Sequence, residues 1–136
     1  MRSVFLLICL LAVGCAAHDE AFYLRRGREI QSQLLAEFEG VESLHDLFRR
    51  QESLSLLFDE LARTAIEARR YQLRSKTSWE IPPELSEMSQ ELEEQMQRVL
   101  AIPGARAFLE RCQSRGFDRL DAFEKAAPHA CSKGMR

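Results

Sequence analysis

A long amphipathic stripe in the middle of the chain constrains the fold more than any other feature of this sequence. Its apolar residues recur three and four positions apart, which places them on one face of a helix. The stripe extends to about Arg74 and predicts a helix of some 30 residues, roughly 45 Å long, which Ser53 could divide in two. It comprises Leu44, Leu47, Phe48, Leu54, Leu57, Phe58, Leu61, Ala65 and Ala68.

Start and stop signals on both sides of this stripe predict further helices. Asp19 is a plausible N-cap for a helix that ends before Gly40, and Ser43 can cap the long helix, with Asp46 three residues on. Residues 77–83 form a linker, and Pro83 suits the first position of the next helix.

The C-terminal third predicts one more helical stretch and no strand. Pro103 and Gly104 end the preceding helix, and the last apolar segment carries Phe108, Leu109 and Cys112, with an expected pause at Gly116. No run alternates polar and apolar residues over four positions. The sequence therefore predicts an all-α fold, a small irregular bundle of about four amphipathic helices.

The N-terminus reads as an export signal. Arg2 is followed by ten apolar residues, Val4 to Val13, and a spanning helix would need roughly 20. Leu11-Ala12-Val13-Gly14-Cys15 resembles the lipobox of bacterial membrane lipoproteins, with Gly14 and Cys15 matching the residues on either side of the cut. Ala12 departs from the leucine that the family prefers at its position.

The resemblance implies how the chain is anchored. Cys15 would carry diacylglycerol and an N-acyl chain, which together hold a protein stably on a membrane. Ala16 after the cysteine resembles lipoproteins sent to the outer membrane of Gram-negative bacteria, so we expect a cell-envelope location. The alternative is a soluble secreted protein cut after Ala17, since Cys15-Ala16-Ala17 also suits the ordinary signal peptidase.

These signals divide the chain into a removed signal (1–14), a lipidated tether (15–18), a helical domain (19–128) and a polar tail (129–136). The full chain has a formal net charge of −2, and losing Arg2 leaves −3, which argues against nucleic acid as a partner. Of four cysteines, Cys112 and Cys131 remain after processing and lipidation. They can form a disulfide worth about 3 kcal/mol, or stay free thiols with Cys112 in the core.

Motifs for catalysis or metal binding are missing from the sequence. It has no G-x-S-x-G or S-x-x-K, and His18, His45 and His129 are far apart. We therefore expect no enzyme activity, cofactor or metal ion. The group of Glu91, Glu93 and Glu94 is expected to be a solvated face, with Glu94 pairing Arg98 four residues on.

Two features are candidate contacts for a partner. Arg69, Arg70 and Arg74, with Lys76, could meet an anionic surface, although cations at a helix C-terminus are also stabilised by the dipole alone. Trp79 lies in a proline-rich loop, where it either serves recognition or packs over the bundle end.

The expected function follows from this compartment and architecture. We expect a non-enzymatic envelope lipoprotein that acts as an adaptor or structural component through contacts with another envelope protein. A carrier with an apolar cavity for a lipid or small molecule is the alternative from a different class. A hydrolase would require an active-site pocket, which the sequence does not predict.

Overall fold

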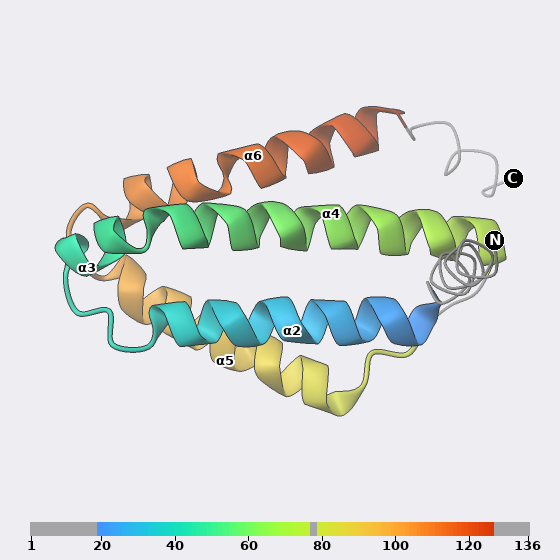
Figure 1. The fold of residues 1–136 in the computed structure, drawn as a ribbon, viewed down its shortest axis with the longest axis horizontal. Coiled ribbons are helices and arrows are strands. Elements are labelled where there is room, and N and C mark those ends of the chain that lie inside the picture. The colour runs from blue at the N-terminus through green and yellow to red at the C-terminus, as the bar shows by residue number, and fades with distance from the viewer. Residues whose placement is uncertain (1–18, 77–78, 127–136) are drawn as a thin grey trace, which may run out of the picture.

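A computed structural model describes residues 19–76 and 79–126 of the chain. It confirms the all-α prediction, since the described residues form helices, turns and loops without a strand. With the labels of Figure 1, the helices are α2 (Glu20–Phe38), α3 (Leu44–Arg49), α4 (Gln51–Ser75), α5 (Pro83–Leu100) and α6 (Ala105–Ala126). No helix in this part of the chain is long and apolar enough to cross a membrane.

Local capping signals position the helix ends as the sequence predicts. The Asp19 carboxylate accepts the Phe22 N–H at 3.1 Å and begins α2. Ser43 and Asp46 form a reciprocal capping box at the start of α3, in which each side chain accepts the other residue's backbone N–H. Gly40 has φ +76° after α2, and Pro83 is the first residue of α5.

The long central helix is broken at Arg50, and the prediction of a break at Ser53 is wrong. Arg50 has φ −105° and ψ 7°, and its N–H bonds to the Leu47 carbonyl at 3.0 Å, which closes the short helix α3. Ser53 lies inside α4 and donates its hydroxyl to Glu37 of α2 at 2.7 Å. Its polar group thus joins two helices.

The expected pause at Gly116 is also wrong, because α6 continues through it. Gly116 is buried against α4, where an added Cβ would lie 3.1 Å from the Phe58 carbonyl oxygen and 3.3 Å from the Ala62 Cβ. The missing side chain therefore serves the close approach of two helices.

In the view of Figure 1, α6, α4 and α2 lie one below another, and α5 crosses behind α2. α4 packs between α6 and α2, and α5 packs against α2. α5 and α6 are joined by a short loop and diverge from it, as Figure 1 shows.

The hydrophobic core lies mainly toward the loop that joins α5 to α6. It takes the second half of α2, the first half of α4, the second half of α5 and the first half of α6. Its fully buried large side chains are Ile30, Leu34, Phe38, Val41, Leu47, Leu54, Val99, Phe108 and Leu109. The opposite half of the bundle, where α2 begins and α4 ends, holds fewer of them.

Candidate functional site

A buried carboxylate anchors α6 to α4. Asp59 of α4 is 6% exposed, and its Oδ1 accepts a hydrogen bond from Arg119 Nε at 2.5 Å. Arg63 approaches the other oxygen at 3.4 Å. Since a buried charge is costly unless it is paired, these two cations are what make Asp59 tolerable inside the bundle.

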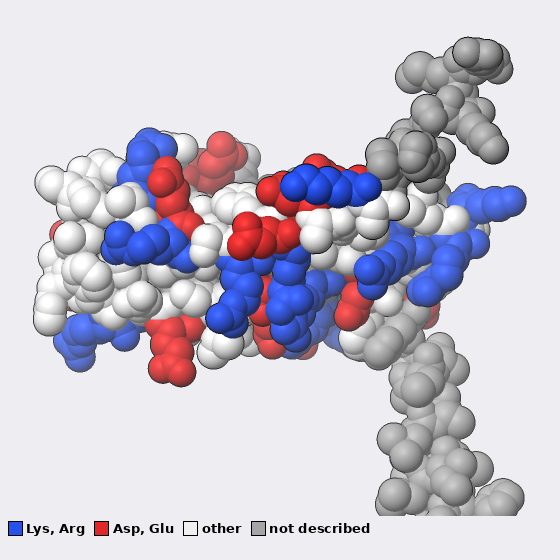
Figure 2. Space-filling view, turned by 90° about the horizontal axis from the view of Figure 1, so that it is seen from above, with Lys and Arg blue, Asp and Glu red and all other residues white. Residues whose placement is uncertain are grey.

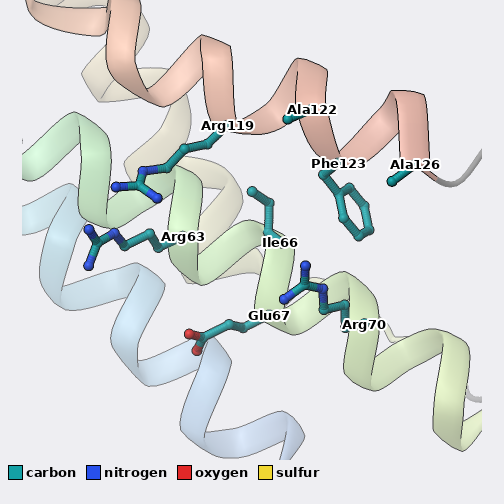
Figure 3. A pocket seen from close by; sticks show the side chains of 8 residues that line it. All are labelled: Arg63, Ile66, Glu67, Arg70, Arg119, Ala122, Phe123 and Ala126. Carbon is teal, nitrogen blue, oxygen red and sulfur yellow. The ribbon is translucent and has the colours of Figure 1, made fainter.

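The cleft beside this pair runs between α4 and α6 and has a volume of about 500 Å³. In Figure 3, Arg63 and Arg119 reach toward each other from facing helices, and Arg70 lies beneath the ring of Phe123. The Arg70 guanidinium is 5.6 Å from the centre of that ring, a cation–π contact. Glu67 also lines the cleft, so its charge and that of Asp59 offset most of the positive charge.

This cleft has no catalytic arrangement. Two of its arginines are engaged by Asp59, and none of its lining residues is a serine, cysteine or histidine. Within residues 19–76 and 79–126 no three metal-binding side chains come together. We therefore interpret the cleft as the polar edge of the contact between α4 and α6.

An apolar groove is the second hollow of the bundle. It is lined from α4, α5 and α6, has a volume of about 380 Å³, and contains one polar side chain, Gln113. Phe117 on its α6 wall is 55% exposed, whereas Leu61, Met96 and Leu120 are partly buried. The other lining residues are Phe58, Ala62, Ala65, Leu92 and Gly116.

The groove exists because α5 and α6 diverge on either side of it. α5 is held by α2 and α6 by α4, so part of the α4 surface between the two walls stays open. Ala65 is exposed there and Leu61 is partly buried, whereas Phe58 and Ala62 are buried at the base of the groove.

α5 also carries five exposed glutamates outside the groove lining, of which Glu84 pairs with Arg28 of α2 at 3.4 Å. Its one cation, Arg98, is engaged elsewhere. The helix that supplies this wall of the groove is therefore acidic on its exposed surface. The glutamates are Glu84, Glu87, Glu91, Glu93 and Glu94.

The expected pairing of Glu94 with Arg98 is wrong. Arg98 donates to the backbone carbonyls of Val41 at 2.7 Å and Phe38 at 2.8 Å, where α2 ends. Glu94 instead accepts a hydrogen bond from Gln90 at 3.3 Å. A cation that caps the last carbonyls of another helix gains more than an exposed ion pair, since those carbonyls lack helical partners.

The far end of α4 gathers the predicted contact residues. Trp79 stacks on Tyr23 with ring centres 6.0 Å apart and an interplanar angle of 22°, and its ring lies 5.6 Å from that of Tyr71. It is partly buried over this end of the bundle. Whether Trp79 also serves recognition stays a prediction.

The predicted basic residues share this end of the bundle. Arg69, Arg70 and Arg74 are all exposed on the last turns of α4, followed by Lys76, and no described carboxylate pairs with Arg69, Arg74 or Lys76. Figure 2 shows Lys and Arg predominating at the right-hand end of the face it displays, whereas the left-hand end is mostly uncharged.

The predicted processing and disulfide residues are only partly described. Gly14, Cys15 and Cys131 lie outside the described residues. Cys112 is a buried free thiol, and burial raises its pKa, against smaller opposite effects of a hydrogen bond with Ser55 and of Arg111. This is the geometry of the free-thiol alternative, and the bond to Cys131 stays a prediction.

Two features of the structure were not predicted, and the sequence held a weak signal for only one of them. Asp59 follows two core residues directly, and a carboxylate at the edge of an apolar stripe calls for a buried partner. Phe117 and Leu120 give no such signal, since nothing in their spacing says that they remain uncovered. No protein family, curated protein or solved structure was found to match this chain.

Proposed function

We propose that this protein is a lipid-tethered adaptor of the bacterial envelope that binds an amphipathic helix of another envelope protein in the groove formed by α4, α5 and α6. The observation that carries the proposal is the groove itself, an apolar hollow on α4 between two diverging helices. Laying the apolar face of a helix into such a groove is a common way for helical proteins to bind a partner.

The chemistry of the groove specifies its partner. Apolar walls require apolar residues three and four positions apart on the incoming helix. The glutamates on α5 favour lysine or arginine along one flank of that helix, because opposite charges steer association and set its orientation. The occupant is thus a basic amphipathic helix.

The lipid anchor is the second part of the proposal and rests on the resemblance of residues 11–15 to a lipobox. An adaptor held on the membrane meets other membrane proteins at high effective concentration, so a groove of modest size suffices. The anchor and the groove are independent claims, and different measurements test them.

Site-specific photocrosslinking in the native host tests the groove. A benzophenone amino acid at Phe117 is expected to capture one protein, and the crosslinked peptide should be an apolar-periodic, basic helix. The same probe at Arg115, exposed on α6 outside the groove lining, is the control. Leu61→Glu, which puts a charge into the groove, should abolish capture from Phe117.

Capture that is equal from both positions, or that survives Leu61→Glu, would argue against the groove as the binding site. A crosslinked peptide that is acidic or extended would contradict the stated partner.

A lipid or small-molecule carrier remains the second candidate, favoured by the groove volume of about 380 Å³, which is typical of ligand sites. Such sites bury most of their ligand, whereas Phe117 leaves more than half of its surface in solvent. A carrier would show a lipid adduct in native mass spectrometry that Leu61→Glu removes.

A further inference from the structure

The end of the bundle nearest the proposed tether combines positive charge with exposed apolar side chains. From residue 68 to 79 the sequence has four cations and no acid. Leu73 is 46% exposed within this stretch, and Ile81 is 67% exposed just after it. These are two of the five large apolar side chains that the described residues leave exposed.

Two of these residues lie on one stripe of α4. Arg69 and Leu73 are four positions apart, which places them one above the other on the same face. Helical spacing of four and three positions leads back from Arg69 to Ala65, Ala62 and Phe58, which line the groove. Lys76, with φ 53°, is the left-handed residue that follows the end of the helix, so Leu73 lies between two cations in the sequence.

The N-terminal tether leaves from this same end. α2 begins where α4 ends, since the rings of Tyr23 and Tyr71 lie 5.7 Å apart (Figure 1). Cys15 precedes Asp19 by four residues, which span at most about 14 Å when extended. Lipid on Cys15 would therefore hold this end of the bundle close to the headgroups, within reach of their surface potential.

We propose that this end of α4, together with Ile81, forms a membrane-docking surface, defined by Arg69, Leu73, Arg74, Lys76 and Ile81, that binds an anionic phospholipid bilayer. The cations bind lipid phosphates, while Leu73 and Ile81 enter the interface, as on helices that lie in the membrane plane. This inference rests on the proposed anchor for its geometry. It orients the molecule with the α5–α6 loop away from the bilayer and the groove between.

Acidic residues at this end of the bundle do not neutralise the positive charge of the docking surface. Asp19 and Glu20 begin α2, and the Asp19 carboxylate is engaged by the Phe22 N–H. Glu67 and Glu80 lie at the two ends of the acid-free stretch. The docking surface therefore presents three cations and two apolar side chains, against one neighbouring acid, Glu80, which precedes Ile81.

The only tryptophan of the chain makes the docking measurable. Trp79 lies beside the docking surface, so quenching of its fluorescence by lipids with brominated acyl chains reports this end of the molecule alone. The natural protein, purified with its anchor, is reconstituted into brominated phosphatidylcholine vesicles with or without phosphatidylglycerol. Since the anchor holds the protein to both, a difference in quenching measures docking.

We expect strong quenching in the anionic vesicles and weak quenching in the neutral ones. Each cation near an anionic surface is worth about a fivefold change in partitioning, so Arg69→Gln, Arg74→Gln and Lys76→Asn together should lower the ratio of docked to undocked protein about 100-fold. Asparagine suits position 76, whose φ is 53°. Quenching in this variant should fall to the neutral-lipid level.

A control variant removes the same charge elsewhere. Arg49→Gln, Arg106→Gln and Arg115→Gln alter exposed arginines on α3 and α6 and should leave quenching unchanged. Leu73→Ser with Ile81→Ser should lose at least half of the quenching. Equal quenching in neutral and anionic vesicles, or full quenching in either docking-surface variant, would overturn the proposal.

The intact mass of the same preparation shows independently whether the protein carries the lipid anchor. An acylated protein without anionic-specific quenching would refute docking and leave the adaptor proposal standing. An unacylated protein that still shows such quenching when added to the vesicles would refute the anchor and leave docking standing.

Discussion

Replacing each of two helical glycines by alanine should change stability in opposite directions. Gly27 in α2 has open space where a Cβ would lie, with no atom within 4 Å. Alanine there should raise the free energy of unfolding by about 0.5–1 kcal/mol, because glycine is the poorer helix former. Gly116 in α6 gains the same propensity, but its new Cβ would lie 3.1 Å from a backbone oxygen of α4.

The crowding at Gly116 decides the sign of the second change. A backbone carbonyl inside a helix cannot turn aside as a flexible side chain can, so α6 must move away from α4. Overpacking of this kind costs about 1–3 kcal/mol, which exceeds the propensity gain and leaves Gly116→Ala about 1 kcal/mol less stable than the natural protein.

Urea unfolding followed by circular dichroism measures both variants against the natural sequence. The two should differ by about 2 kcal/mol, or about 8 °C in Tm at roughly 4 °C per kcal/mol for a domain of this size. An unchanged m-value would show that the unfolded states are comparable. If Gly116→Ala stabilises as much as Gly27→Ala, the α4–α6 approach is not a steric constraint and the account of Gly116 is wrong.

Three further predictions concern polar contacts. Arg119→Met should lower the free energy of unfolding by about 2 kcal/mol, because it leaves buried Asp59 with Arg63 alone. Adding Asp59→Leu should recover most of that loss. Denaturation of the single and double variants measures both effects, and a double variant no more stable than Arg119→Met would contradict the prediction. Arg98→Met should lower the free energy of unfolding by about 2 kcal/mol, because its bonds to the Phe38 and Val41 carbonyls are lost. Arg106 makes no polar contact with the described side chains, so Arg106→Met should cost less than about 0.5 kcal/mol. Thermal melts compare the two variants, and equal losses would contradict the role of Arg98. The Glu42 backbone N–H, with help from Ser43 and Arg50, holds the pKa of Asp46 below its ordinary value. The ionised Asp46 carboxylate therefore stabilises the protein fully above its unfolded-state pKa, and this stabilisation is lost as pH falls through its folded-state pKa. The stability of Asp46→Asn should fall less with acid over that range than the stability of the natural protein, and a series of melts at different pH values tests this.

Local signals in the sequence were sufficient for most helix ends. Asp19, Ser43, Gly40 and Pro83 act within a few residues of their own positions, so their roles could be predicted from spacing alone. The helical class followed in the same way from apolar periodicity.

Contacts between distant residues could not be predicted in this way. Arg98 donates to carbonyls nearly 60 residues earlier, and Asp59 pairs with Arg119 where α6 packs on α4, so neither contact has a local sequence signal. Gly116 looked like a helix break because its partner, the Phe58 backbone, is equally remote.

The groove was hidden for a related reason. Apolar spacing shows that Phe117 faces other residues of the bundle or a partner, but it cannot show that α5 leans away and leaves the ring exposed. That depends on the docking of α5 against α2, which is set by the whole core.

Intact mass spectrometry of the mature protein from its native membrane tests the central claim, the lipid anchor, most directly. We expect the mass of residues 15–136 plus that of diacylglycerol and one further acyl chain on Cys15. A mass that begins at His18 and carries no lipid would contradict it, and the protein would then be a secreted one without a membrane tether.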